Sequence, residues 1–74
     1  METSKIEEAR REVGEQLRKA RKDAGMTLEQ VADICGIDNT AISRIENGTR
    51  NASVDIIARI AAAVGMRLDF APKN

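Results

Sequence analysis

Apolar residues recur at helical spacing along most of the chain. From Ser4 an apolar residue follows every three or four positions for about five turns, which predicts an amphipathic helix that ends at Gly25. Its apolar stripe consists of Ile6, Ala9, Val13, Leu17, Ala20 and Ala24. The spacing returns in residues 54–64, with Ser53 as a candidate N-cap and Gly65 as a stop signal. The second stripe consists of Val54, Ile57, Ile60, Ala61 and Val64. The pattern predicts a mainly α-helical fold.

Between these helices, residues 27–48 have the pattern of two short helices joined by a tight turn. The first is expected at residues 28–35 and the second at residues 39–47, with Gly36 where the backbone must turn sharply. The apolar positions expected in the core are Leu28, Val31, Ala32, Cys35, Ile37, Ile42 and Ile45.

Both short helices carry capping residues. Thr27 and Gln30 form a capping box, in which the Thr hydroxyl accepts from an amide one turn in and the Gln side chain reaches back. Asp38 is a favourable N-cap for the second helix and complements its dipole. Gly48 can take the left-handed conformation that ends this helix.

The periodicity changes after the last helix. Residues 66–70 alternate apolar and polar side chains, which is the period of a strand, and Pro72 would end it. The strand residues are Met66, Arg67, Leu68, Asp69 and Phe70. A lone strand in a helical chain lacks a partner, so we expect it to pair with the same strand of a second copy about a two-fold axis. A last helical turn packed on the core is the alternative.

The composition limits the possible classes of protein. With 74 residues, we expect residues 1–74 to form a single domain, and with Phe70 as the one aromatic residue its core must be aliphatic. One cysteine excludes an intrachain disulfide, and the absence of His excludes a zinc site of the usual ligands, so no metal and no cofactor is expected. No apolar run approaches the roughly 20 residues of a membrane span, and the N-terminus lacks a signal-peptide core. We therefore expect a cytoplasmic protein with no membrane partner.

The net charge is zero, with twelve basic and twelve acidic residues. This balance argues against a strongly basic protein that binds nucleic acid without sequence preference. It leaves room for a binder that concentrates its cations on one face.

Residues 27–48 resemble the helix-turn-helix of the phage repressor and Cro family, also called the xenobiotic-response-element type. The resemblance covers residues 17–64 and is most specific in the ending ISRIENGTR, since a helix that closes in I-x-x-[IL]-E-N-G is typical of this family. The other matching positions are Ala32 at the helix crossing, Gly36 in the turn, and Ile42 and Ile45 as inward residues. It implies a four-helix, lambda-repressor-like DNA-binding domain. The tail after the fourth helix resembles the branch of HipB-type antitoxins, whose C-terminal strands pair across a dimer.

The resemblance also implies which residues contact bases, because the second helix of such a motif lies in the major groove. With Ile42 and Ile45 facing inward, the outward positions expected to contact bases are Asn39, Thr40, Ser43 and Arg44. Asn pairs with adenine, Arg with guanine, and Thr offers a hydroxyl or a methyl group. The alternatives are a phosphate contact for Arg44 and ordinary first-turn capping for Asn39 and Thr40.

Phosphate contacts are expected at the start of the first short helix and in the loop after the second. The residues are Thr27, Asn47, Thr49, Arg50 and Asn51. A plain interhelical turn is the alternative for the loop. The chain departs from the family at Leu28, where a Gln often contacts phosphate, and Glu29 would repel a phosphate unless it points away. The family also implies a structural ion pair between Arg21 and Glu46.

We therefore expect a sequence-specific DNA-binding transcriptional regulator. Since one recognition helix contacts too few base pairs, we expect a homodimeric repressor that binds a palindromic operator in double-stranded DNA. The alternative is an antitoxin that binds its own promoter and also a toxin protein, for instance through an acidic patch on the first helix. This patch consists of Glu2, Glu7, Glu8 and Glu12. An enzyme is not expected, because the chain has no His and no Gly-rich phosphate loop and Cys35 has the position of a core residue.

Overall fold

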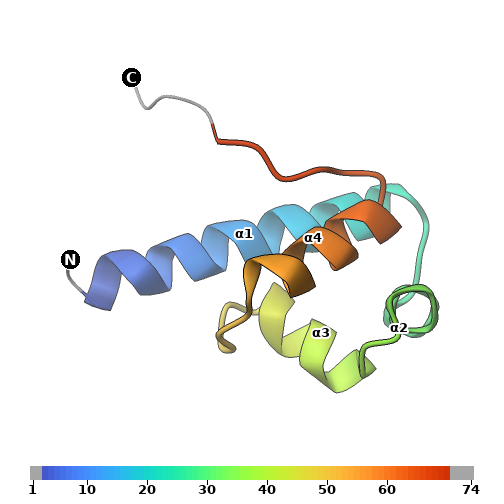
Figure 1. The fold of residues 1–74 in the computed structure, drawn as a ribbon, viewed down its shortest axis with the longest axis horizontal. Coiled ribbons are helices and arrows are strands. Elements are labelled where there is room, and N and C mark those ends of the chain that lie inside the picture. Colours follow the sequence, from blue (N-terminus) through green and yellow to red (C-terminus); the bar gives the residue numbers. More distant parts are fainter. Residues whose placement is uncertain (1–2, 71–74) are drawn as a thin grey trace.

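The computed structural model describes residues 3–70, and four α-helices form most of this part of the chain (Figure 1). They are α1 (Thr3–Asp23), α2 (Leu28–Cys35), α3 (Asn39–Glu46) and α4 (Val54–Ala63). All four predicted helices are present; the ends of α2 are as predicted, and those of the other helices lie within two residues of the predicted ends. Residues 1–2 and 71–74, which include Glu2 and Pro72, lie outside the described residues. Within residues 3–70 no helix is both long enough and apolar enough to cross a membrane.

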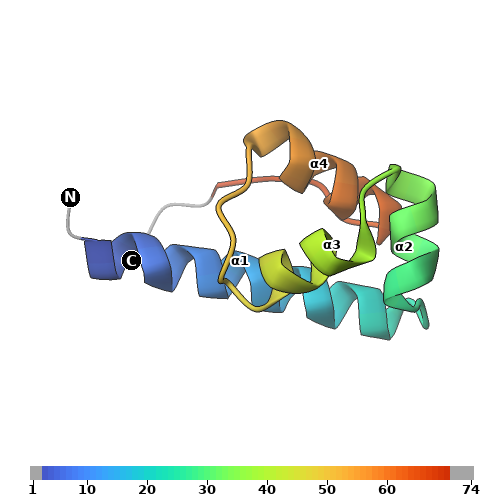
Figure 2. The same ribbon diagram turned by 90° about the horizontal axis from the view of Figure 1, so that it is seen from below.

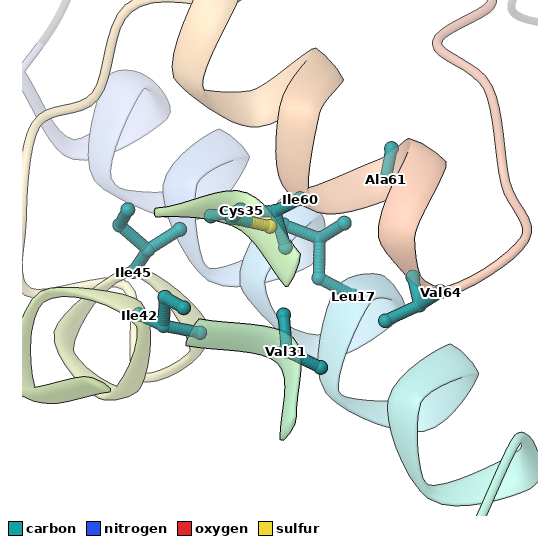
Figure 3. Close-up of a cluster of buried hydrophobic side chains, with 8 residues drawn as sticks. All are labelled: Leu17, Val31, Cys35, Ile42, Ile45, Ile60, Ala61 and Val64. Carbon is teal, nitrogen blue, oxygen red and sulfur yellow. The ribbon is translucent and has the colours of Figure 1, made fainter. Parts of the chain in front are cut away.

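The four helices meet around an aliphatic core, as the composition predicted (Figure 3). Helix α3 packs against α1 and α2, and α2 also packs against α4. The core consists of Leu17, Val31, Cys35, Ile42, Ile45, Ile60, Ala61 and Val64. Leu28, Ala32 and Ile37 are half-buried at its edge. Each of the four helices therefore contributes at least one side chain to the same core.

The apolar stripes of α1 and α4 are only partly covered. On α1 the stripe is buried at Leu17, but Ile6 is 39% exposed. On α4, Ile60 is buried whereas Val54 at the start of the helix is 69% exposed. Periodicity predicts which side of a helix is apolar, but the described chain places no element over these outer turns.

The tail, residues 66–70, forms neither a strand nor a helical turn within the described residues, so the predicted strand is not seen. Gly65, with φ 82°, ends α4, and the tail then turns back along α4 toward the N-terminal half of α1, on the side away from α3 (Figures 1 and 2). A strand requires a neighbouring backbone to accept and donate its hydrogen bonds, and residues 3–70 offer none beside the tail. Pairing of two tails concerns a second chain and stays a prediction.

Gly14, in the middle of α1, marks the closest approach between α1 and α3. A Cβ atom at this position would overlap the carbonyl oxygens of Ile45 and Glu46, and it would lie 2.8 Å from the carbonyl carbon of Glu46. The neighbouring atoms belong to the backbone, so they cannot rotate away. Glycine normally lowers the stability of a helix, but Gly14 is the position at which the backbone of α1 contacts the end of α3.

We predict that Gly14→Ala destabilises the protein, although Gly→Ala inside a helix normally stabilises by roughly 0.5–1 kcal/mol. The added methyl group must push α3 away from α1, and we expect the free energy of unfolding to fall by about 1–3 kcal/mol. Urea denaturation followed by circular dichroism measures this change. Gln16→Ala, at an exposed position of the same helix, is the control and should stay within about 0.5 kcal/mol of the wild type. A Gly14→Ala protein of equal or higher stability would contradict the close approach.

Candidate nucleic-acid interface

Helix α3 has a buried side and an exposed polar side. Its buried residues are Ala41, Ile42, Ile45 and Glu46. Asn39, Thr40 and Arg44 are exposed and Ser43 is half-buried, so the four expected base-contacting residues lie away from the core. The hydroxyl of Thr40 lies 3.5 Å from Oδ1 of Asn39, at the long limit for a hydrogen bond. The two side chains are therefore neighbours at the N-terminal end of α3.

The turn between α2 and α3 depends on Gly36. This residue has φ 68° and ψ 29°, a left-handed conformation that L side chains rarely adopt. Its N–H donates to the carbonyl oxygen of Ala32 at 2.8 Å and closes the last turn of α2. Asp38 stands at the expected N-cap position of α3, but within the described residues its side chain makes no capping hydrogen bond. The predicted N-cap position is therefore confirmed without a side-chain hydrogen bond, and Asp38 is exposed at the surface.

Thr27 forms the expected capping box with Gln30. The hydroxyl oxygen of Thr27 accepts from the Gln30 N–H at 3.1 Å, and the Thr27 N–H donates to Oε1 of Gln30 at 2.8 Å. Because the hydroxyl acts as an acceptor in the cap, its own hydrogen remains available to donate to another oxygen. The side chain is exposed at the N-terminal end of α2, where the helix dipole favours an anion.

The end of α3 is closed by backbone hydrogen bonds of the Schellman type. Gly48, with φ 74°, donates to the Ile45 carbonyl at 3.1 Å, and the Thr49 N–H donates to the Arg44 carbonyl at 3.0 Å. The Thr49 hydroxyl also donates to the Arg44 carbonyl, at 3.2 Å. Of the expected phosphate-contacting residues here, Asn47, Arg50 and Asn51 are exposed, whereas the hydroxyl hydrogen of Thr49 is already engaged. Thr49 would have to rotate before it could donate to a phosphate.

Arg21 of α1 and Glu46 of α3 form an ion pair under the end of α3. Nε of Arg21 lies 2.7 Å from Oε2 of Glu46, and Nη2 lies 3.0 Å from Oε1, so the contact is bidentate. Nη1 of Arg21 donates to the carbonyl of Met26 at 3.0 Å. The side chains are only 11% and 5% exposed, and the hydrogen bonds to Glu46 raise the pKa of Arg21. The pair therefore joins α1, the connection to α2, and α3.

Three carboxylates lie beside the start of α3, and the role of Asp33 among them was not predicted from the sequence. Glu29, Asp33 and Asp38 line a shallow groove between α2 and α3, with Asn39 at its edge. Glu29 and Asp33 are four residues apart on α2 and therefore share a face, so the sequence already indicated that their negative charges lie together. Leu28 is half-buried against the core and therefore offers no phosphate contact.

Cys35 is a core residue, as expected. It is 6% exposed, and its thiol lies 3.5 Å from the carbonyl oxygen of Arg59 in α4. Burial raises the pKa of the thiol, which keeps it protonated and a poor nucleophile. The residue therefore supports packing of α2 on α4.

Comparison with known sequences identifies related proteins. A family model described as helix-turn-helix matches residues 17–70, more than half of the chain. Control protein C.BamHI from Bacillus amyloliquefaciens is 40% identical over 62 aligned residues, with 77% of this chain and 76% of that protein covered. An uncharacterized HTH-type transcriptional regulator from Mycobacterium tuberculosis is 33% identical over 51 residues, which cover 69% of this chain but only 36% of that protein.

Two solved structures share the fold. The restriction-modification controller protein C.AhdI from Aeromonas hydrophila superimposes with a TM-score of 0.75 at 29% identity, covering 80% of this chain and 89% of that one. The clp gene regulator ClgR from C. glutamicum gives a TM-score of 0.76 at 29% identity, covering 80% of this chain and 76% of that one. These relatives are named as controllers and regulators, so the antitoxin alternative has no support. The chain belongs to the helix-turn-helix family of DNA-binding transcription regulators, of the phage repressor type that residues 27–48 resemble.

Proposed function

We propose that residues 1–74 form a single domain, two copies of which bind one palindromic operator and repress transcription from the promoter that contains it. The observation that carries this proposal is the division of α3 into a buried apolar side and an exposed polar side. The buried side fixes the helix to the core, and the polar side has the dimensions and the chemistry to enter a major groove.

Base recognition is assigned to the exposed side of α3. Asn39 and Thr40 lie at its N-terminal end, the part of a recognition helix that approaches base edges most closely. Arg44 lies one turn further on, with an exposed guanidinium group suited to the O6 and N7 atoms of guanine. Ser43, which is half-buried, reaches less far and is assigned the weakest base contact.

Phosphate binding is assigned to both ends of the helix pair. Thr27 offers a hydroxyl hydrogen at the positive end of α2, and Asn47, Arg50 and Asn51 are exposed beyond α3. Phosphates held at these two places would bracket the recognition helix and fix its register along the groove.

The acidic groove beside α3 favours specific over non-specific binding. Glu29, Asp33 and Asp38 repel phosphates at every DNA sequence, whereas base contacts are gained only at the correct one. Together with a net charge of zero, these carboxylates lower the affinity for random DNA. Two copies on one operator supply the affinity that one copy lacks, which is the reason for proposing a homodimer.

The similarity to two controller proteins suggests the class of genes that the operator serves. C.BamHI is 40% identical, and C.AhdI, which shares the fold, is named as a restriction-modification controller. We infer that this chain controls restriction and modification genes. A selected operator should then occur upstream of such genes beside the gene for this chain; an operator found only before unrelated genes would refute this assignment.

We predict that selection from a random duplex pool yields a palindrome. In Asn39→Ala and Arg44→Ala, each lost base contact should weaken operator binding by about 10- to 100-fold per half-site, because one bidentate contact contributes about 1–3 kcal/mol of discrimination. Fluorescence anisotropy on the operator and on a scrambled duplex measures the loss, with circular dichroism to show that the variants fold.

Arg50→Ala is the matched control for this experiment. It removes an exposed cation assigned to phosphate, so binding should fall equally on operator and scrambled duplex, and the salt dependence of binding should become shallower by about one ion per copy. Equal binding of both duplexes by the wild type would defeat the specific-repressor proposal.

We predict strong energetic coupling between Arg21 and Glu46. Either Arg21→Ala or Glu46→Ala leaves a buried charge unpaired and should cost about 3–5 kcal/mol, and the double variant should cost much less than the sum. Chemical denaturation measures the cycle; Arg21→Lys and Glu46→Gln replace the alanine variants if those fail to fold.

The chain contains its own control pair for this cycle. Nζ of Lys19 lies 2.7 Å from Oδ2 of Asp23, but these side chains are 78% and 65% exposed. Their coupling should be much weaker than that of Arg21 and Glu46, because water screens an exposed pair. Additive effects at Arg21 and Glu46 would exclude the pair as the element that orients α3.

A further inference from the structure

An apolar groove lies between the tail, the start of α4 and the middle of α1. We call it the tail groove. Its volume is about 600 Å³, and apart from Asp69 its lining is apolar: Val13, Ala52, Val54, Ile57, Leu68 and Phe70. A second hollow of about 220 Å³ shares Val13, Ala52 and Ile57 with it and extends along α1 past Ala9 to Ile6. The two hollows share their apolar lining at these three residues and so adjoin along α1 and the start of α4.

Several apolar side chains of the tail groove are exposed. Phe70 is 94% exposed, Val54 69% and Leu68 40%. Exposed apolar residues that stand singly are common on protein surfaces, but a contiguous patch beside a groove is typical of an interface. Phe70 is also the chain's one aromatic residue, and aromatic side chains are the commonest anchors of protein interfaces.

We propose that the tail groove is the dimer interface, and that each copy places its Phe70 side chain in the groove of the other. This inference rests on the proposed function for the existence of a dimer, and it adds the surface and the anchoring residue. One chain carries both the exposed Phe70 ring and the tail groove that would receive it. A surface of this kind is self-complementary and closes about a two-fold axis, whereas an unrelated partner would need only the hollow.

The charges at the groove support a second copy as the occupant. Arg10 lines the second hollow, and its Nε atom is buried without a hydrogen-bond partner among residues 3–70. Asp69 lines the tail groove next to Phe70, and its carboxylate accepts only from the N–H of Phe70, at 2.9 Å, among the same residues. When Phe70 of one copy enters the groove of the other, its neighbour Asp69 approaches Arg10 of that copy. A carboxylate there satisfies the buried donor, which costs free energy while it stays unpaired.

The position of the surface agrees with two copies on one DNA duplex. None of the four base-contacting residues assigned to α3 lines either hollow. Arg50 and Asn51, assigned to phosphate, lie at the end of the second hollow. A second copy seated there leaves the exposed side of α3 free and brings the two phosphate-binding loops next to each other.

Sedimentation equilibrium of the full chain without DNA tests the proposal. The wild type should dimerise, and Phe70→Ala should weaken the dimer by at least about 10-fold, because a few anchor side chains in desolvated pockets supply most of the binding free energy of an interface. Ile34→Ala is the matched control, since Ile34 is a 63% exposed apolar residue on α2 outside the groove, and it should leave the dimer unchanged. Circular dichroism shows that both variants fold.

A charge exchange tests the contact between copies. Arg10→Glu and Asp69→Arg should each weaken the dimer, and the double variant should recover most of the loss, because the pair is then restored with reversed signs. Recovery supports the contact, and a double variant weaker than either single one overturns it.

The outcomes separate this inference from the proposed function. A Phe70→Ala protein that dimerises as tightly as the wild type overturns the tail groove as the interface, even if the wild type selects a palindrome. If Phe70→Ala dissociates as expected while the wild type binds scrambled duplexes equally well, the interface stands and the specific-repressor function fails. A wild type that stays monomeric at about 100 μM, far above the dissociation constants of specific homodimers, also overturns the interface.

Discussion

The buried contact between Arg21 and Glu46 is the constraint that joins the end of α3 to α1. Glu46 is held twice, since its carboxylate accepts from the guanidinium of Arg21 and its backbone carbonyl lies against Gly14. The guanidinium also donates to the carbonyl of Met26 in the connection between α1 and α2. A buried ion pair adds little net stability over an apolar pair of the same size, because both charges lose their hydration. Its geometric specificity is the more important contribution. The planar guanidinium of Arg21 donates to both carboxylate oxygens of Glu46 and to the carbonyl of Met26, and these three hydrogen bonds together fix how α1 and α3 are arranged.

This constraint matters because α2 and α3 are too short to be stable alone. Each has eight residues, well below the roughly 12–15 at which an isolated helix begins to persist in water. The capping box at Thr27, the left-handed Gly36 and the Schellman closure at Gly48 satisfy backbone groups that the short helices leave free. Burial of Val31, Ile42 and Ile45 then holds both helices to α1 and α4. The exposed polar side of α3 is therefore presented by a rigid support.

Local signals in the sequence were enough to predict the helices, the caps and the inward positions Ile42 and Ile45, because each depends on residues within one or two turns. Gly14 could not be understood in this way, since the atoms that exclude a side chain there lie about thirty residues further along the chain. Asp38 has the position of an N-cap without its hydrogen bond, which depends on a rotamer that the sequence does not specify. The roles proposed for individual residues towards DNA rest on the resemblance to the family and on their exposure around α3.

The difference between local signals and contacts made far along the chain also explains the tail and the uncovered turns of α1 and α4. Periodicity places Ile6 and Val13 on the apolar side of α1, and Val54 and Ile57 on the apolar side of α4. Alternation places Leu68 and Phe70 on one side of the tail. Within one chain these sides meet only in part and leave a groove with the aromatic ring exposed beside it. Leaving this much apolar surface in water costs free energy in the monomer, and a chain with so small a core has little to spare. The proposed dimer recovers that free energy while it doubles the DNA contacts, and its interface covers the apolar surface that one copy leaves open.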